Sequence, residues 1–178
     1  GLAREYSSMI ENHIIDSKWL SKPRPIVYNS WEAMYFDMNE DKLYDLAVKA
    51  KDLGMECFVV DDGWFSKRRN DRSSLGDWTV SQEVFPNGIK AFGKKIHDIG
   101  LMFGMWFERE MISPDSQLFK EHPDWVVAHP FSRLSIARNQ YCLDFSDPEV
   151  IDCIYRQMVA VIDEANLDYI KWDHNRNI

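Results

Sequence analysis

The chain has 178 residues, 45% of them hydrophobic and 13% aromatic, a composition that suits one domain with a sizeable core and excludes a disordered chain. Its 29 acidic and 21 basic side chains give a net charge of −8, which argues against a nucleic-acid partner. No run approaches the ~20 apolar residues that cross a bilayer, so no membrane partner is expected.

The first predicted element is a helix at the start of the chain. Apolar residues recur at helical spacing over residues 2–15 and include Ala3, Tyr6, Met9, Ile10 and Ile14. Pro23 and Pro25 then prevent the helix from continuing. Residues 26–28 follow as a short strand, which ends in the sequence Asn29-Ser30-Trp31.

Helices and strands then alternate to the end of the chain. Asp37 and Glu40 form a predicted capping box for the first of three helices, which ends at Gly54. The second helix covers residues 89–99, and the third begins at Ser146-Asp147-Pro148-Glu149, a typical helix start. The remaining strands are predicted at residues 57–60, 101–105 and 167–170.

This alternation predicts an α/β fold with a parallel sheet and right-handed crossovers. Every predicted strand ends in a polar cluster with a tryptophan in or beside it, whereas the opposite loops, after Gly54 and Gly100, are very short. That asymmetry favours a TIM-type (β/α)-barrel, whose active site lies at the carboxyl ends of its strands. A doubly wound sheet is the alternative, but the first strand lacks the glycine-rich phosphate loop of that fold. A full barrel needs about 250 residues, so four strands correspond to a half-barrel.

The strongest candidate site is the sequence Lys171-x-Asp173-x-Asn175 after the fourth strand. Alternation along a strand places Lys171 and Asp173 on one face, together with Asn175 if the extended backbone continues. A neighbouring lysine keeps a carboxylate ionised, as a covalent nucleophile requires. The alternative is a structural ion pair between Lys171 and Asp173 at the strand end.

A second pair of carboxylates, Asp61 and Asp62, follows the strand at residues 57–60. Adjacent acids can bind two neighbouring sugar hydroxyls, although Asp-Gly sequences are also common in plain turns. Together with Glu108 and Glu110, these acids could instead bind magnesium or calcium. The tryptophans around them fit a sugar better than a metal ion.

Tryptophans and basic residues near the strand ends give two further expectations. Trp31, Trp64 and Trp106 occupy matching positions, which suggests a wall on which a sugar ring stacks, although core packing explains any one of them. The basic run at residues 67–72 is interpreted as a solvated loop because the chain as a whole is acidic.

Cysteine usage bears on the cellular compartment. Cys57, Cys142 and Cys153 have no metal-type spacing, and their odd number favours reduced thiols. The first residues carry no signal-peptide pattern. A cytoplasmic location is therefore expected.

Six motifs between Pro25 and Ile178 are specific enough to compare with known families: Asn29-Ser30-Trp31-Glu32-Ala33, Val60-Asp61-Asp62-Gly63-Trp64-Phe65, Ser74-Leu75-Gly76-Asp77-Trp78, Trp106-Phe107-Glu108, Arg138-Asn139-Gln140 and Lys171-Trp172-Asp173. They resemble the catalytic barrel of retaining α-galactosidases of glycoside hydrolase family 36. The resemblance implies that residues 25–178 form the first half of a (β/α)8 barrel. It also implies that residues 1–24 are a helical lead-in, which joins the barrel to a preceding β-sandwich.

The resemblance also implies roles for individual residues. Asp173 corresponds to the nucleophile that forms the glycosyl-enzyme, and Asp61 and Asp62 correspond to acids that hold galactose hydroxyls. Further substrate-binding residues are implied at Trp31, Trp106, Arg138, Lys171 and Asn175. The implied substrate is an α-galactoside, with no metal and no organic cofactor.

Two residues depart from the family pattern. Arg109 stands where the family usually has proline, and His174 stands where an apolar residue, often methionine, is usual. Both departures are expected to alter the rim of the pocket or its preference among sugars.

The four strands also leave the catalytic machinery incomplete. Retaining hydrolysis needs a second carboxyl group about 5–5.5 Å from the nucleophile, and in the family this acid/base comes from a sixth strand. One hypothesis is therefore a catalytic-domain fragment of an α-galactosidase. The other is a catalytically silent half-barrel that self-associates and binds sugar weakly. Because the first and fourth strands have open edges, a homodimer or higher even oligomer is expected.

Overall fold

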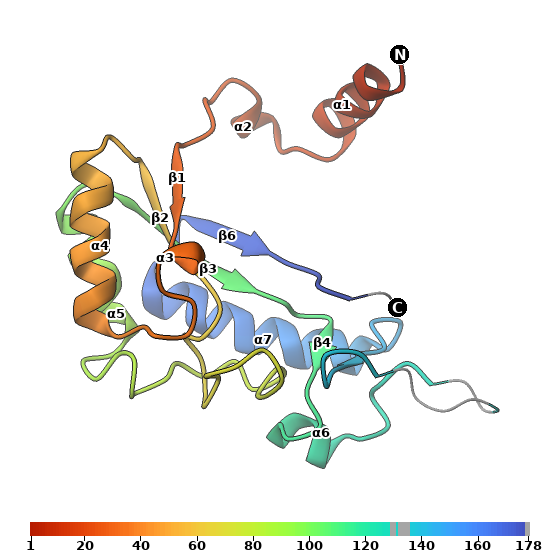
Figure 1. Cartoon of the computed structure of the whole chain (residues 1–178). Coiled ribbons are helices and arrows are strands. Elements are labelled where there is room, and N and C mark those ends of the chain that lie inside the picture. The colour runs from red at the N-terminus through yellow and green to blue at the C-terminus, as the bar shows by residue number, and fades with distance from the viewer. Residues whose placement is uncertain (129–130, 132–135, 177–178) are drawn as a thin grey trace.

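The computed structural model describes residues 1–128, 131 and 136–176, which form an α/β fold around a four-stranded parallel sheet (Figure 1). The strands are β1 (Val27–Asn29), β2 (Cys57–Val60), β3 (Met102–Phe107) and β6 (Tyr169–Trp172). Their order in the sheet is β1-β2-β3-β6, so each strand lies beside the next one along the chain. The predicted parallel α/β sheet is confirmed.

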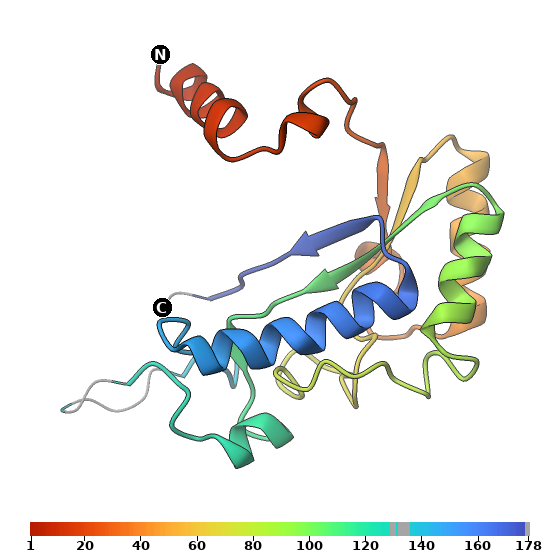
Figure 2. The same ribbon diagram turned by 180° about the vertical axis from the view of Figure 1, so that it is seen from behind.

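Three long helices connect these strands and cover one face of the sheet (Figures 1 and 2). They are α4 (Glu40–Asp52), α5 (Ile89–Asp98) and α7 (Pro148–Ala165). The strand residues that face these helices are buried and apolar, and they include Phe58, Val60, Phe103, Met105 and Phe107. Burial of this apolar surface is the main force that holds the helix layer on the sheet.

The ends of two helices differ in detail from the predicted capping. Asn39, rather than Asp37, caps α4, because its side-chain oxygen accepts a hydrogen bond from the backbone N–H of Lys42 at 2.9 Å. The predicted capping box is therefore wrong, and Glu40 turns instead toward Lys95. The predicted start of α7 is confirmed, with Asp147 as its cap.

The fourth strand begins two residues later than predicted. The backbone N–H of Leu167 still bonds to the carbonyl of Ile162 at the end of α7, so Leu167 belongs to the helix cap. The strand consequently includes Lys171 and Trp172. Trp106 of β3 pairs in register with Lys171, which brings the ends of the two strands together.

Shorter helices and strands follow β1 and β3. A short helix, α3 (Trp31–Met34), follows β1. The segment after β3 holds α6 (Gln117–Glu121) and a two-stranded antiparallel sheet of β4 (Met111–Ile112) and β5 (Tyr141–Cys142). Among its described residues, this segment therefore contains regular helix and strand structure.

The start of the chain lies apart from the helix layer. Helices α1 (Leu2–His13) and α2 (Ser17–Leu20) lie on the other side of the strands from α7 in both views (Figures 1 and 2). None of their residues is buried, and apolar Leu2 is 81% exposed. Within the described ranges, none of the helices has the length and hydropathy of a membrane span.

Candidate active site

The polar residues predicted from the sequence gather at the carboxyl ends of the parallel strands. Asp61 follows β2, and Trp106 and Lys171 lie near the ends of β3 and β6. Gly104 of β3 leaves room for the neighbouring residues Tyr169 and Val59, since a Cβ atom there would lie 3.0 Å from each of them. Side chains at the ends of β1, β2 and β6 are hydrogen-bonded to one another at this edge of the sheet.

Asp61 is the centre of one hydrogen-bond network. Its carboxylate accepts hydrogen bonds from Lys171 Nζ at 2.7 Å and from Asn29 Nδ2 at 2.5 Å. Its backbone N–H donates to Ser30 Oγ at 3.0 Å. Lys171 therefore pairs with Asp61 across the sheet, and the alternative interpretation, an ion pair between Lys171 and Asp173, is wrong.

Asp173 has its own set of donors. Trp106 Nε1 and Asn175 Nδ2 donate to its Oδ2 at 2.8 and 2.9 Å, and the backbone N–H of His174 donates to its Oδ1 at 2.9 Å. Partial burial alone would raise the pKa of this carboxyl, but these hydrogen bonds and the charge of Lys171 hold it below its usual value. The carboxylate is therefore ionised at neutral pH and fixed in direction.

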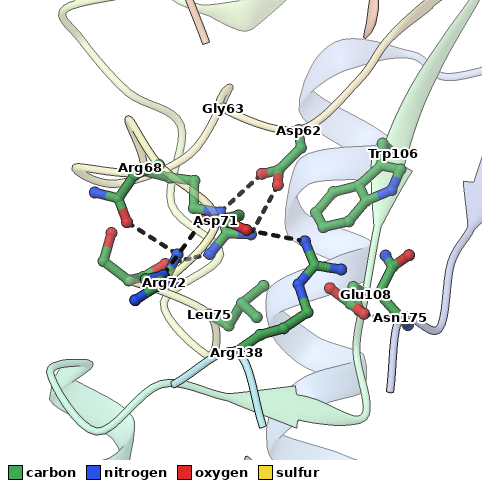
Figure 3. Close-up of polar contacts among 12 residues, drawn as sticks. Asp62, Gly63, Arg68, Asp71, Arg72, Leu75, Trp106, Glu108, Arg138 and Asn175 are labelled. Carbon is green, nitrogen blue, oxygen red and sulfur yellow. Dashed lines mark hydrogen bonds and ion pairs between the residues drawn. The ribbon is translucent and has the colours of Figure 1, made fainter. Parts of the chain in front are cut away.

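Asp62 has a different environment from Asp61. Arg68 binds it through two parallel hydrogen bonds, Nε to Oδ1 at 2.9 Å and Nη2 to Oδ2 at 2.7 Å (Figure 3). The Arg68 side chain is completely buried and that of Asp62 is 7% exposed. Burial raises the pKa of Asp62 above its usual value, while the Arg68 guanidinium opposes that rise.

The burial of Arg68 corrects the interpretation of residues 67–72 as a solvated loop. Lys67 and Arg72 are exposed, as expected. Arg68 instead points inward to Asp62, and Arg69 Nη1 donates to the carbonyl of Gly63 at 2.9 Å. Counting charges along the sequence could not separate the inward arginines from the outward ones.

Arg138 reaches the same region from the segment before β5. Figure 3 shows its guanidinium directed toward Trp106 and Glu108. Its Nη2 lies 3.4 Å from Asp71 Oδ2, and both Arg138 and Asn139 have left-handed backbone angles, with φ of 52° and 56°. Such angles are uncommon outside glycine and occur often at functional sites.

Glu108 and Glu110 do not act as one pair. Glu108 is buried and accepts a hydrogen bond from the backbone N–H of Asn175 at 2.6 Å, whereas Glu110 accepts bonds from Trp172 Nε1. Burial raises the pKa of Glu108, and the charge of Asp173 adds to the rise. Among the residues that the structure describes, no three His, Cys, Asp or Glu side chains are placed to hold a metal ion.

The three tryptophans have three different roles. Trp31 is half-buried and lines a cavity of about 410 Å³ together with Asn29 and Lys171. Trp106 is nearly buried and uses its indole N–H on Asp173. Trp64 is completely buried among aromatic side chains and donates to the carbonyl of Trp106, so the expected sugar wall does not include it.

Of the two departures, Arg109 lies elsewhere than expected. It is completely buried between aromatic side chains, so it cannot form the rim of a pocket. His174 is exposed next to Asp173. The sequence did not single out Arg68 or the side chain of Asn29, although Asn29 ends its strand as the acidic residues end theirs.

Comparison with known proteins places this geometry in a family. The melibiase family matches the chain over residues 1–178. The α-galactosidase Mel36A of Lactobacillus acidophilus is 49% identical over 177 residues, which make up 99% of this chain and 24% of that protein. The chain thus spans about a quarter of this relative's length.

Solved structures agree with the sequence comparison. The GH36 α-galactosidase AgaA from Geobacillus stearothermophilus superposes with a TM-score of 0.93 and 42% identity, covering 100% of this chain and 25% of that one. An AgaA variant in complex with stachyose superposes with a TM-score of 0.91 and 40% identity, covering 99% of this chain and 24% of that one.

Proposed function

Since the chain belongs to the melibiase family, we propose that it carries part of the active site of a retaining α-galactosidase. Its substrates would be terminal α-D-galactosides, and the AgaA complex with stachyose supports that class. The observation that carries the proposal is Asp173, an ionised carboxylate at a strand end with a fixed direction.

In the proposed reaction, an Asp173 oxygen attacks the anomeric carbon of galactose while the bond from that carbon to the leaving oxygen breaks. The leaving oxygen takes a proton from a second carboxylic acid. Water then attacks the anomeric carbon of the glycosyl-enzyme, gives a proton to the same acid/base, and releases galactose and free Asp173. The sequence resemblance assigns the acid/base to a strand beyond these four.

The other residues would bind and orient the sugar. Asp61, held by Lys171 and Asn29, is the proposed acceptor for one galactose hydroxyl. Asp62 is the proposed acceptor for the adjacent hydroxyl of the same sugar. Trp31 would form a wall of the pocket. Trp106, Arg138 and Asn175 complete the proposed set. No metal ion or organic cofactor takes part in this scheme.

The four strands are proposed to be the first half of a (β/α)8 barrel. Within the described residues, β1 and β6 each have one neighbouring strand and one open edge. Two copies could close their edges together, so we propose a homodimer or higher even oligomer. The alternative function, a silent half-barrel that binds sugar weakly, follows from the same open edges. Three free cysteines agree with the proposed cytoplasmic location.

The decisive experiment is covalent trapping with a fluorinated galactosyl fluoride, which forms a slowly hydrolysed glycosyl-enzyme. We expect mass spectrometry to locate the label on the peptide that contains Asp173, with no label in Asp173→Ala. The exposed-residue variant Asp152→Asn is the control and should label as the wild type does. Labelling at another carboxylate would disprove the assignment of the nucleophile. Galactose binding without labelling or turnover at any protein concentration would favour the silent half-barrel.

A further inference from the structure

Arg109 is a buried cation whose guanidinium has no hydrogen-bond acceptor in the part of the chain that the structure describes. It follows β3, between Glu108 and Glu110, and its side chain has no exposure to solvent. Its Nε, Nη1 and Nη2 atoms have no hydrogen-bond partner among the described residues. Arginine presents five N–H groups, so this is a large number of unsatisfied donors for one position. Native proteins leave few such groups unpaired, and each one calls for an explanation.

Two aromatic rings stabilise the charge of Arg109 but leave its N–H groups unused. The guanidinium carbon lies 4.4 Å from the centroid of the Trp78 ring and 4.2 Å from that of Phe107. A ring face attracts a cation through its electron density. The N–H bonds of a guanidinium lie in its own plane, so strong acceptors must approach from the edge.

Trp78 adds a further donor at the same place. Its indole Nε1 is also buried and has no partner within the described part of the chain. The guanidinium carbon of Arg109 lies 4.4 Å from the centroid of this ring, so the unpaired indole N–H is on a side chain that contacts the unpaired guanidinium. The region therefore contains a positive charge and several donors.

No carboxylate of the described residues forms an ion pair with Arg109. None of the ion pairs of the described residues includes Arg109, and Glu110 uses its oxygens on Trp172. Burial lowers the pKa of Arg109 to about 9, which still leaves the group protonated at neutral pH. A buried charge without a counter-charge is strongly unfavourable.

We propose that Arg109 and Trp78 bind a small monovalent anion of the chloride class. Such an anion accepts several N–H groups at once and neutralises the guanidinium. A water molecule would accept hydrogen bonds but would leave the charge in place, and its own hydrogens would need acceptors. Complete burial of Arg109 excludes a large organic anion. The site lies beside Phe107, whereas Glu108 turns to Asn175 in the candidate active site.

The inference does not depend on galactosidase activity, so its test is stability. The melting temperature of the 178-residue chain should be measured while chloride replaces gluconate at constant ionic strength. If the folded state alone binds chloride, the folding equilibrium constant rises about 11-fold at a chloride concentration ten times the Kd. We expect a saturating rise for the wild type and for Arg72→Met, which removes an exposed arginine.

Two variants test the donors separately. Arg109→Met should abolish the chloride response, and Trp78→Phe, which removes the indole N–H, should weaken it. If Arg109→Met does not fold, Trp78→Phe and crystals soaked in bromide still decide the question. We expect an anomalous bromide peak within hydrogen-bond distance of Arg109 and Trp78. A water or an empty space there, or an equal response to chloride and gluconate, would overturn the proposal.

Discussion

Two regions near the end of β3 differ in how many hydrogen-bond partners their charged side chains have. On the candidate active-site side, Asp61 and Asp173 each accept several well-placed hydrogen bonds. On the other side, Arg109 and Trp78 offer donors and find no acceptor in the described residues. In the first region, hydrogen bonds within the chain satisfy both carboxylates. In the second region, the Arg109 guanidinium has no acceptor among the described residues. Counting donors against acceptors therefore separates a prearranged site from one that needs a bound partner.

The largest effect is expected from removing the best-supported carboxylate. In any preparation of the chain that hydrolyses an aryl α-galactoside, Asp173→Ala should lower turnover by about 10²–10⁴-fold, because the central nucleophile is lost. Added azide should restore part of the rate by taking the place of the carboxylate. Unchanged turnover in Asp173→Ala would show that the nucleophile lies elsewhere.

Breaking the buried pair of Arg68 and Asp62 should make that region resemble the one around Arg109. Arg68→Met leaves the Asp62 carboxylate buried without its counter-charge, and we expect a loss of about 3–5 kcal/mol in the free energy of unfolding. Urea denaturation measures this loss. Lys94→Met, which removes an exposed lysine from its pair with Asp98, is the matched control and should change stability little. A similar small loss for both variants would contradict the importance given to burial.

The two adjacent aspartates should respond differently to the same substitution. Asp62→Asn weakens a buried bidentate pair, so we expect a loss of about 1–3 kcal/mol in stability. Asp61→Asn should cost less than about 1 kcal/mol, because Lys171 is partly exposed and can turn to water. Both variants should bind galactose more weakly, as titration calorimetry can measure. Equal melting temperatures for the two variants would show that Asp61 and Asp62 contribute equally to stability.

The smallest effects are expected in the dependence of stability on pH. The lowered pKa of Asp173 stabilises the folded state above the ordinary value of 3.8, and this contribution is lost as pH falls through the folded-state pKa. The raised pKa of Glu108 acts in the opposite direction, since stability should increase as pH falls from its folded-state pKa toward 4.5. Denaturation from pH 7 to pH 3 should lose the first effect in Asp173→Asn and the second in Glu108→Gln. Curves identical to the wild type would show that neither group titrates differently on folding.

Local patterns in the sequence were sufficient for the four strands of the parallel sheet and the three helices between them, but not for the short elements α3, α6, β4 and β5. Apolar runs, glycines and helix starts predicted the strands and crossover helices, because these signals depend on neighbours a few residues away. The same reasoning placed Asp61 and Asp173 at strand ends. Barrel closure stays a prediction, since the sheet of the described residues has two open edges.

Partners across the sheet could not be read from the sequence. Lys171 and Asp61 are 110 positions apart, and their contact depends on how the strands align. Spacing within one strand favoured Asp173 as the partner of Lys171. Arg68 was expected in a solvated loop and Arg109 at the rim of a pocket. Arg68 is instead buried against Asp62, and Arg109 is buried between the rings of Trp78 and Phe107.

Asn175 joins two carboxylates through two chemically distinct amides. Its backbone N–H donates to Glu108, and its side-chain amide donates to Asp173. In a nitrogen-edited NMR spectrum these two amides give separate signals, so one isotopically labelled residue reports on both acids. A shift of the backbone signal alone follows the proton on Glu108, and a shift of the side-chain signal alone follows the proton on Asp173. The spectrum of this one asparagine therefore reports the order in which Glu108 and Asp173 are protonated as the pH falls.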